Sequence, residues 1–163
     1  MAAGTTNKAP VNAYTFYSIA SRQARLERLP DETPRGVFAF STGAVDIATT
    51  NVDDAADQVF FLTFPGKAYL MDLQVTAEDL DDGTDLVFDV IVENSAGTEV
   101  VLINDTTIGQ AGGSDRLDAD GHLLRDVSNQ MLGIKIVTAA GTPAAGAITL
   151  KGVVWLGDLP SIV

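Results

Sequence analysis

The chain has 163 residues, a length that predicts one domain able to bury a hydrophobic core without cross-links. Hydrophobic residues make up 46% of it and charged residues 20%, which excludes global disorder, and the absence of cysteine excludes disulfides and thiolate metal sites. The net charge of −12 arises in residues 36–163, where nineteen acidic residues face five basic ones, so we expect no binding of this part to nucleic acid.

The N-terminal segment, residues 1–35, has the reverse balance, with five basic and three acidic residues. Residues 1–13 are small and polar, and we interpret them as a flexible end. They contain no apolar run of secretory length, and no stretch elsewhere approaches a membrane span. We therefore expect no membrane partner. The arginines of this segment could instead meet an acidic protein surface.

Residues 14–35 predict an extended arm that contains a short helix. Ser18 or Ser21 can cap a helix over about 21–29, which Pro30 and Pro34 would end. Its apolar residues form a poor stripe, so the segment is either a loosely packed extension or an arm that orders against a partner. Aromatic and arginine side chains are favoured in interface hot spots. The residues expected to contact a partner are Tyr14, Phe16, Tyr17, Arg22, Arg25, Arg28, Leu29 and Arg35.

From Gly36 onward the apolar residues alternate, which is typical of β-strands. Clusters of Gly, Pro, Asn and Asp separate eight runs: "GVFAFS", "AVDIATT", "DQVFFLTF", "AYLMDLQVTA", "DLVFDVIVE", "TEVVLIN", "LGIKIVTA" and "GAITLKGVVWLG". No long helix intervenes. The predicted fold is therefore all-β, with an antiparallel β-sandwich or jelly roll over residues 36–163.

The alternation also predicts which side chains face the core. In residues 69–76, Tyr69 and Met71 are expected to share one side with Leu73 and Val75. In residues 86–93, the apolar side chains Leu86, Phe88, Val90 and Val92 are expected to face the core, with Asp89 and Glu93 outward.

The last run, "GAITLKGVVWLGD", predicts an apolar outer surface. If its core-facing residues include Ile148 and Leu150, then Val153 and Trp155 face outward. The run "DQVFFLTF" is likewise apolar on both faces. Either other segments of the chain cover these surfaces or another subunit does. The second interpretation predicts a homo-oligomer that self-associates through Val153 and Trp155, such as a closed ring, with a trimer as one option.

An acidic turn lies between two predicted strands, and its carboxylates belong to Asp79, Asp81, Asp82 and Asp85. An EF-hand loop needs Gly at position 6 and Glu at position 12. A frame that begins at Asp79 has Thr84 and Ile91 there, and "DRLDADGHLLRD" fails similarly. We expect a turn, because Asp and Gly supply the backbone conformations that a strand connection needs. A looser calcium site is the alternative, but we expect no metal and no cofactor.

No catalytic constellation is recognisable in the sequence. The one histidine, His122, sits in a polar loop and is interpreted as exposed. Nucleophile-elbow, zincin, Walker and dinucleotide-binding patterns are absent. A pair of carboxylates could serve a glycosidase, but with nineteen acids some pair will be close by chance. We predict a protein that is not an enzyme and has no catalytic residues.

Three segments within about 66–156 resemble a family of small tailed-phage virion proteins. They are "KAYLMDLQVTAEDLDDGTDLVFDVIVEN", "TTIGQAGGSDRLD" and "MLGIKIVTAAGTPAAGAITLKGVVWL", which share a "DL-D-x-G" turn, a "GQAGG" loop and a closing strand with that family. The family looks like capsid decoration (cement) proteins with jelly-roll-like cores. The resemblance implies a place on the capsid surface, the major capsid protein as partner, and no active site. Residues 1–35 lie outside it, so their role as a capsid-gripping arm is inferred from their own composition.

These observations favour a decoration protein that stabilises the shell through contacts available only in the assembled lattice. Three rivals stay open, and the third is an enzyme, which activity of the purified protein on a polysaccharide would establish. A glycan-binding sandwich would use Trp155 and Tyr69 as stacking platforms and the acidic loops for calcium. A tail or head-fibre component has no sequence feature that separates it from a capsid protein.

Overall fold

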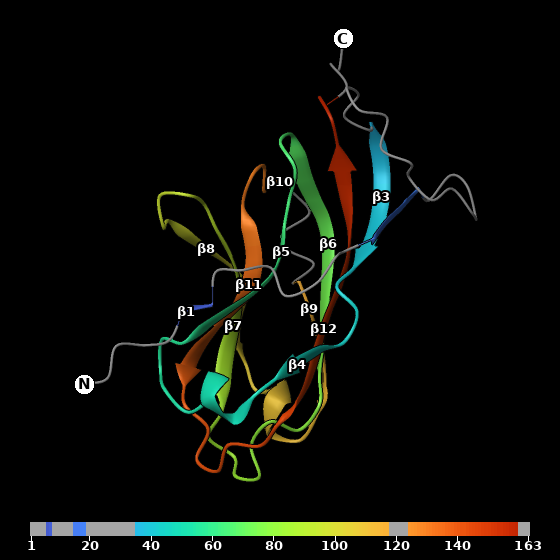
Figure 1. Cartoon of the computed structure of the whole chain (residues 1–163). Helices are drawn as coiled ribbons and strands as arrows, with labels where there is room; N and C mark the ends of the chain where they lie inside the picture. The colour runs from blue at the N-terminus through green and yellow to red at the C-terminus, as the bar shows by residue number, and fades with distance from the viewer. Residues whose placement is uncertain (1–5, 8–14, 19–34, 118–123, 160–163) are drawn as a thin grey trace.

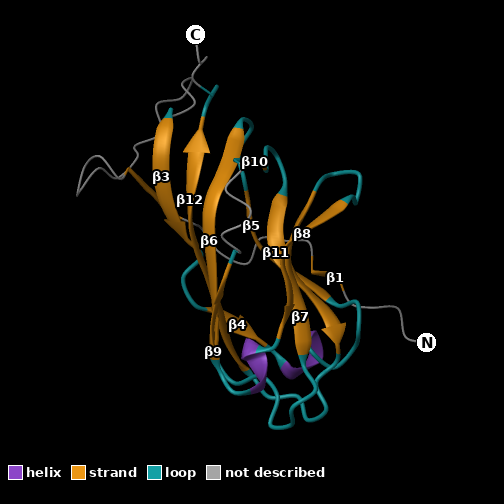
Figure 2. Ribbon diagram, turned by 180° about the vertical axis from the view of Figure 1, so that it is seen from behind, coloured by secondary structure: helices purple, strands orange, loops and turns teal. Residues whose placement is uncertain are grey.

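The structure is a computed structural model of the whole chain, and it describes residues 6–7, 15–18, 35–117 and 124–159. Two β-sheets pack face to face, as Figures 1 and 2 show, so the predicted all-β sandwich is confirmed. The helices within these residues are two short 3₁₀ turns, η1 (Thr49–Asn51) and η2 (Ile108–Gln110). No helix in the described ranges is long and apolar enough to cross a membrane. The helix expected over 21–29 lies outside the described residues.

The first sheet, sheet A, has five strands, and all of its pairs except the parallel pair of its first two are antiparallel. In spatial order they are β1 (Thr6–Asn7), β5 (Gln58–Thr63), β11 (Met131–Thr138), β7 (Val87–Glu93) and β8 (Glu99–Thr106). Strand β8 therefore forms one edge of sheet A.

The second sheet, sheet B, is antiparallel throughout. Its main order is β10 (Arg125–Asp126), β6 (Ala68–Ala77), β12 (Gly146–Leu156), β3 (Gly36–Ser41) and β2 (Thr15–Ser18). Two short strands join it as well, β4 (Val45–Ile47) beside β12 and β9 (Gly113–Arg116) beside β6. Strands β1 and β2 belong to residues 1–35, so a division after residue 35 crosses two hydrogen-bonded strand pairs.

The hydrophobic core lies between the sheets, and β12 supplies it as its alternation predicts. Ile148, Leu150, Val154 and Leu156 are buried in the core cluster. Gly152 interrupts this row, because a Cβ there would lie 2.8 Å from the ring of Phe40. The glycine leaves room for that ring, which meets the ring of Phe64, just after β5 of the opposite sheet, edge-on at a centroid distance of 5.4 Å.

Strand β6 differs from the prediction, because it contains a bulge. Val153 pairs with Asp72, but the next residue of β12 pairs with Leu70, so Met71 is the extra residue. The bulge reverses the alternation. Leu73 and Val75 face the core as predicted, but Met71 is 45% exposed and Tyr69 is half-buried, with Leu70 in the core in their place.

The outer face of sheet A is covered by the chain itself. Phe60 and Ile91 are buried although they are not part of the central core cluster. Gly133 pairs with both, and a Cβ on it would lie 2.7 Å from the Phe60 ring. In and just before β7, the predicted core-facing residues Leu86, Phe88, Val90 and Val92 are buried in the core cluster. Asp89 and Glu93 were expected to be solvated, but they are buried on the outer face of sheet A. Sheet A thus buries apolar side chains on both of its faces.

Candidate interaction surfaces

The outer face of sheet B carries the aromatic side chain that the sequence singled out. Trp155 lies between Tyr69 of β6 and Val37 of β3, and in the next outward row Val153 lies beside Ala39. All five side chains are half-buried, on the side away from the core. We call these five residues the Trp155 face. The outward orientation predicted for Val153 and Trp155 is confirmed, whereas their role in self-association stays a prediction.

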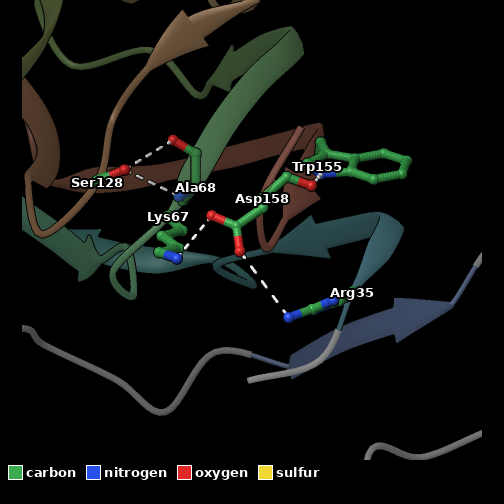
Figure 3. A network of polar contacts seen from close by, with 6 residues as sticks. All are labelled: Arg35, Lys67, Ala68, Ser128, Trp155 and Asp158. Carbon is green, nitrogen blue, oxygen red and sulfur yellow. Dashed lines mark hydrogen bonds and ion pairs between the residues drawn. The ribbon is translucent and has the colours of Figure 1, made fainter. Parts of the chain in front are cut away.

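A charged network borders the Trp155 face at the end of β12. The carboxylate of Asp158 accepts a hydrogen bond from Lys67 Nζ at 2.6 Å and forms an ion pair with Arg35 Nη2 at 3.8 Å. Trp155 Nε1 donates to the backbone oxygen of Asp158 at 3.1 Å. Figure 3 shows the Asp158 carboxylate between Lys67 and Arg35, with Ser128 tied to the backbone of Ala68 nearby. Asp158 therefore contacts both Arg35, which was predicted to contact the capsid, and Trp155, which was predicted to mediate self-association.

Ion pairs lower the pKa of two carboxyl groups beside the face, those of exposed Asp158 and half-buried Asp72. The hydrogen bond from Lys67 lowers the pKa of Asp158. Farther along sheet B, Arg116 binds Asp72 with two hydrogen bonds, Nε to Oδ1 at 2.9 Å and Nη2 to Oδ2 at 2.5 Å. This contact lowers the pKa of Asp72. The carboxylates beside the Trp155 face are thus neutralised by neighbouring cations.

The N-terminal segment reaches the same end of the molecule. In β2, Phe16 and Tyr17 pair with Phe40 and Ala39 of β3, and Ser18 pairs with Phe38. Strand β2 ends at Ser18 and β3 begins at Gly36, and both strands lie in sheet B beside the Trp155 face. The remaining predicted arm residues lie outside the described residues: Tyr14, Arg22, Arg25, Arg28 and Leu29.

The acidic turn is built around one buried carboxylate. Asp81 is fully buried and accepts hydrogen bonds from five backbone N–H groups, those of Gly83, Asp85, Leu86, Gly141 and Thr142, at 2.8–3.3 Å. Burial alone would raise the pKa of Asp81, but the N–H groups, led by that of Thr142, outweigh it and lower the pKa to about 2. Asp81 therefore stabilises the turn instead of binding a ligand.

The other carboxylates of this turn point to solvent. Asp79, Asp82 and Asp85 are exposed, and Asp79 Oδ1 accepts the backbone N–H of Asp81 at 3.2 Å. Among the residues that the structure describes, no three acidic or histidine side chains are grouped so that they could hold a metal ion. The second loop considered, residues 115–126, is described only at its two ends, and His122 lies within residues 118–123, outside the described ranges.

The sequence reasoning missed Lys67 and Asp158, which organise the border of the Trp155 face. Neither residue lies in a recognisable motif, and they are 91 positions apart in the chain. The sequence of β2, "TFYS", does indicate a strand, because it is rich in residues that favour strands. Its pairing with β3 required the tertiary structure.

Comparisons with known proteins identify similar folds. No protein-family model matches the chain, and no curated protein matches it. A chain of the cyanophage Pam1 capsid asymmetric unit is similar, with a TM-score of 0.60 and 23% identity over 84% of this chain and 96% of that chain. A chain of the capsid of Ralstonia phage GP4 has a TM-score of 0.58 and 24% identity over 84% of this chain and 93% of that chain. At these identities the likeness establishes a shared fold.

Proposed function

We propose that this chain is a structural protein of a phage virion, located on the capsid surface, where it decorates and stabilises the shell. The observation that carries the proposal is its fold, which it shares over 84% of its length with chains from two phage capsids. The three segments that resemble tailed-phage decoration proteins support the same assignment. The partner is the major capsid protein.

The Trp155 end of the sandwich is the part that fits such a partner best. It combines half-buried apolar side chains with the exposed cations Arg35 and Lys67. Strands β2 and β3, which flank residues 19–34 in the chain, also lie there. The arginines of residues 19–34, at positions 22, 25 and 28, precede the acidic pair Asp31 and Glu32. The proposed contacts are those of Phe16, Tyr17, Arg35 and residues 19–34, because aromatic and arginine side chains dominate interface energetics.

The proposed mechanism is mechanical. Contacts that bridge neighbouring capsid subunits exist only in the assembled shell, so they stabilise the shell and not its separate subunits. Many weak contacts act together on a lattice, which makes the attachment strong although each contact is weak. The acidic body suits an outer location, because it would be repelled by packaged nucleic acid.

The test replaces residues 19–34 with a short glycine-rich turn, so that β2 and β3 stay paired. We expect the variant to fold and to lose binding to capsids that lack the protein, measured by co-sedimentation with those particles. A finer variant changes Arg22, Arg25 and Arg28 to alanine.

The matched control changes three exposed acids at the opposite end, Asp53, Asp54 and Asp82, to asparagine. We expect this control to bind capsids at parental occupancy. Full occupancy by the variant without residues 19–34 would contradict the arm assignment. Failure of the parent protein to bind any capsid would contradict the proposed function.

A further inference from the structure

A lysine, a glutamate and a glutamine form a hydrogen-bonded group in sheet A. Lys135 of β11 donates from Nζ to Glu99 Oε2 at 2.6 Å, and Gln58 of β5 donates from Nε2 to Glu99 Oε1. The two oxygens of one carboxylate therefore hold two different nitrogens. Glu99 comes from the edge strand β8, whereas Lys135 and Gln58 belong to the neighbouring strands β11 and β5, which Figure 1 shows together. We call these three residues the Lys135 triad.

The backbone places the lysine directly opposite the glutamine. Lys135 and Gln58 are partners across the antiparallel pair of β11 and β5. Direct partners point to the same face of a sheet, and their Cβ atoms lie about 4.5–5.5 Å apart. A covalent link between these side chains would therefore span a short gap between strands that are already paired. On its other side Lys135 is opposite Asp89, whose carboxylate accepts the N–H of Asp105 at 2.7 Å.

The Lys135 triad is largely withdrawn from solvent. Gln58 is 8% exposed, and the side chains of Lys135 and Glu99 are 32% and 28% exposed. The adjacent row of the same face holds Phe60 and Ile91, and both are buried. Water competes with an amine for the carbon of an amide, so its exclusion favours a reaction between the two side chains.

An amine and an amide that share one carboxylate are arranged for transamidation. A lysine amine becomes a nucleophile when a neighbouring base takes its proton, and Glu99 Oε2 is at hydrogen-bond distance from Nζ. The amide nitrogen of Gln58, which would leave, is bonded to the other oxygen of the same carboxylate. One group thus contacts both the nitrogen that must lose protons and the nitrogen that must gain them.

We propose that Lys135 and Gln58 form an intramolecular isopeptide bond, with Glu99 as the carrier of the protons. Glu99 takes a proton from Nζ, and the Nζ lone pair attacks Cδ of Gln58. A bond forms between Nζ and Cδ, and the bond between Cδ and Nε2 breaks. Nζ loses two protons in total, and both pass to Nε2. The lysine ammonium and the primary amide become a secondary amide and an ammonium ion, so no oxidant, reductant or further reactant is needed.

The reaction occurs once in the life of each molecule, so it can be slow. Groups held in a reactive geometry behave as if one were present at about 10⁵–10⁸ M, which compensates for the low reactivity of an amide. The bond would fasten β5 to β11 within sheet A. The inference goes beyond the proposed function and does not depend on capsid binding, so each can fail without the other.

The test is the intact mass of the purified full chain under denaturing conditions. We expect the parent to be lighter than its sequence mass by one ammonia, and a proteolytic digest to contain one fragment in which Gln58 is joined to Lys135. Glu99→Gln keeps the size of the side chain but removes the proton carrier, and Lys135→Arg keeps the charge but removes the nucleophile. We expect both variants to have their full sequence mass.

The matched control is Lys151→Arg, which changes an exposed lysine of β12 and should retain the loss of ammonia. A second measurement is migration on a denaturing gel. The parent should migrate faster than Glu99→Gln, because a cross-link makes the unfolded chain more compact.

A parent with its full sequence mass, unchanged after prolonged incubation at neutral pH, would overturn the inference. A loss of ammonia that persists in Lys135→Arg would overturn it as well, since another residue would then be the source. Persistence of the bond in Glu99→Gln would contradict the role of Glu99. The mass of the parent and its joined fragment decide the existence of the bond even if a variant fails to fold.

Discussion

The two ends of the sandwich use charge in different ways. At the acidic end, the charge of Asp81 is buried and binds five backbone N–H groups of its own chain. At the Trp155 end, Arg35, Lys67 and Asp158 are exposed and surround apolar side chains. The first arrangement stabilises the fold, whereas the second leaves a surface suited to other proteins. A charged cluster in the sequence is thus a poor guide to function until burial is known.

The three short segments singled out in the sequence all lie at the Asp81 end of the sandwich. The "DL-D-x-G" turn, the "GQAGG" loop and the "TAAGT" stretch meet at the Asp81 end. Leu80 N–H donates to Gly109 at 2.8 Å, and Asp82 N–H donates to Thr142 at 3.0 Å. Gly109 has no room for a side chain, because a Cβ there would lie 2.8 Å from Leu86. These three segments therefore specify how one end of the fold is built.

The largest effect on stability is expected from Asp81→Ala. The substitution leaves five N–H groups without their acceptor, that of Leu86 buried and the other four part-buried. Each unsatisfied buried donor costs about 1–3 kcal/mol before the loop relaxes. We expect a loss of roughly 3 kcal/mol or more in the free energy of unfolding, measured by chemical denaturation. The control, Asp82→Ala, changes an exposed neighbour in the same turn and should alter stability by less than about 0.5 kcal/mol. Equal effects of the two substitutions would contradict the role of Asp81.

A smaller effect is expected from acid. The pKa of Asp81 in the folded state is about 2, below its unfolded value of about 3.9. A lowered pKa stabilises the fold fully above the unfolded pKa, and this contribution is lost as the pH falls from about 4 to about 2. We expect the difference in unfolding free energy between the parent and Asp81→Asn to shrink across this window. A difference that stays constant from neutral pH to pH 2 would argue against the assignment.

The smallest effect is expected at the other end, from Asp158→Asn. Its ion pairs with Lys67 and Arg35 are exposed, and exposed ion pairs contribute little to stability. The backbone acceptor for Trp155 is retained. We expect the thermal unfolding temperature to be unchanged. A marked drop in the unfolding temperature would show that the charges at the Trp155 end also stabilise the fold, which would contradict the difference drawn between the two ends.

The sequence predicted the sandwich because alternation is a local property. In β12 it placed Ile148 and Leu150 in the core and Trp155 outside, as the structure has them. In β6 the same reasoning failed at Met71, since a bulge depends on the pairing of the neighbouring strand and leaves no local mark.

The Trp155 face and its charged border were less predictable, because they too depend on contacts between distant parts of the chain. Alternation exposed Trp155 and Val153, but the salt links of Asp158 join residues far apart in the chain. Likewise, four aspartates in one turn look alike in sequence, and only packing distinguishes buried Asp81 from its exposed neighbours.

The most direct test of the capsid assignment is a cryo-EM map of the whole virus particle. The account predicts density for this sandwich on the outside of the shell, with the Trp155 end and residues 19–34 toward the major capsid protein and the Asp81 end toward solvent. Density confined to the tail, or a sandwich whose Asp81 end contacts the shell, would contradict it.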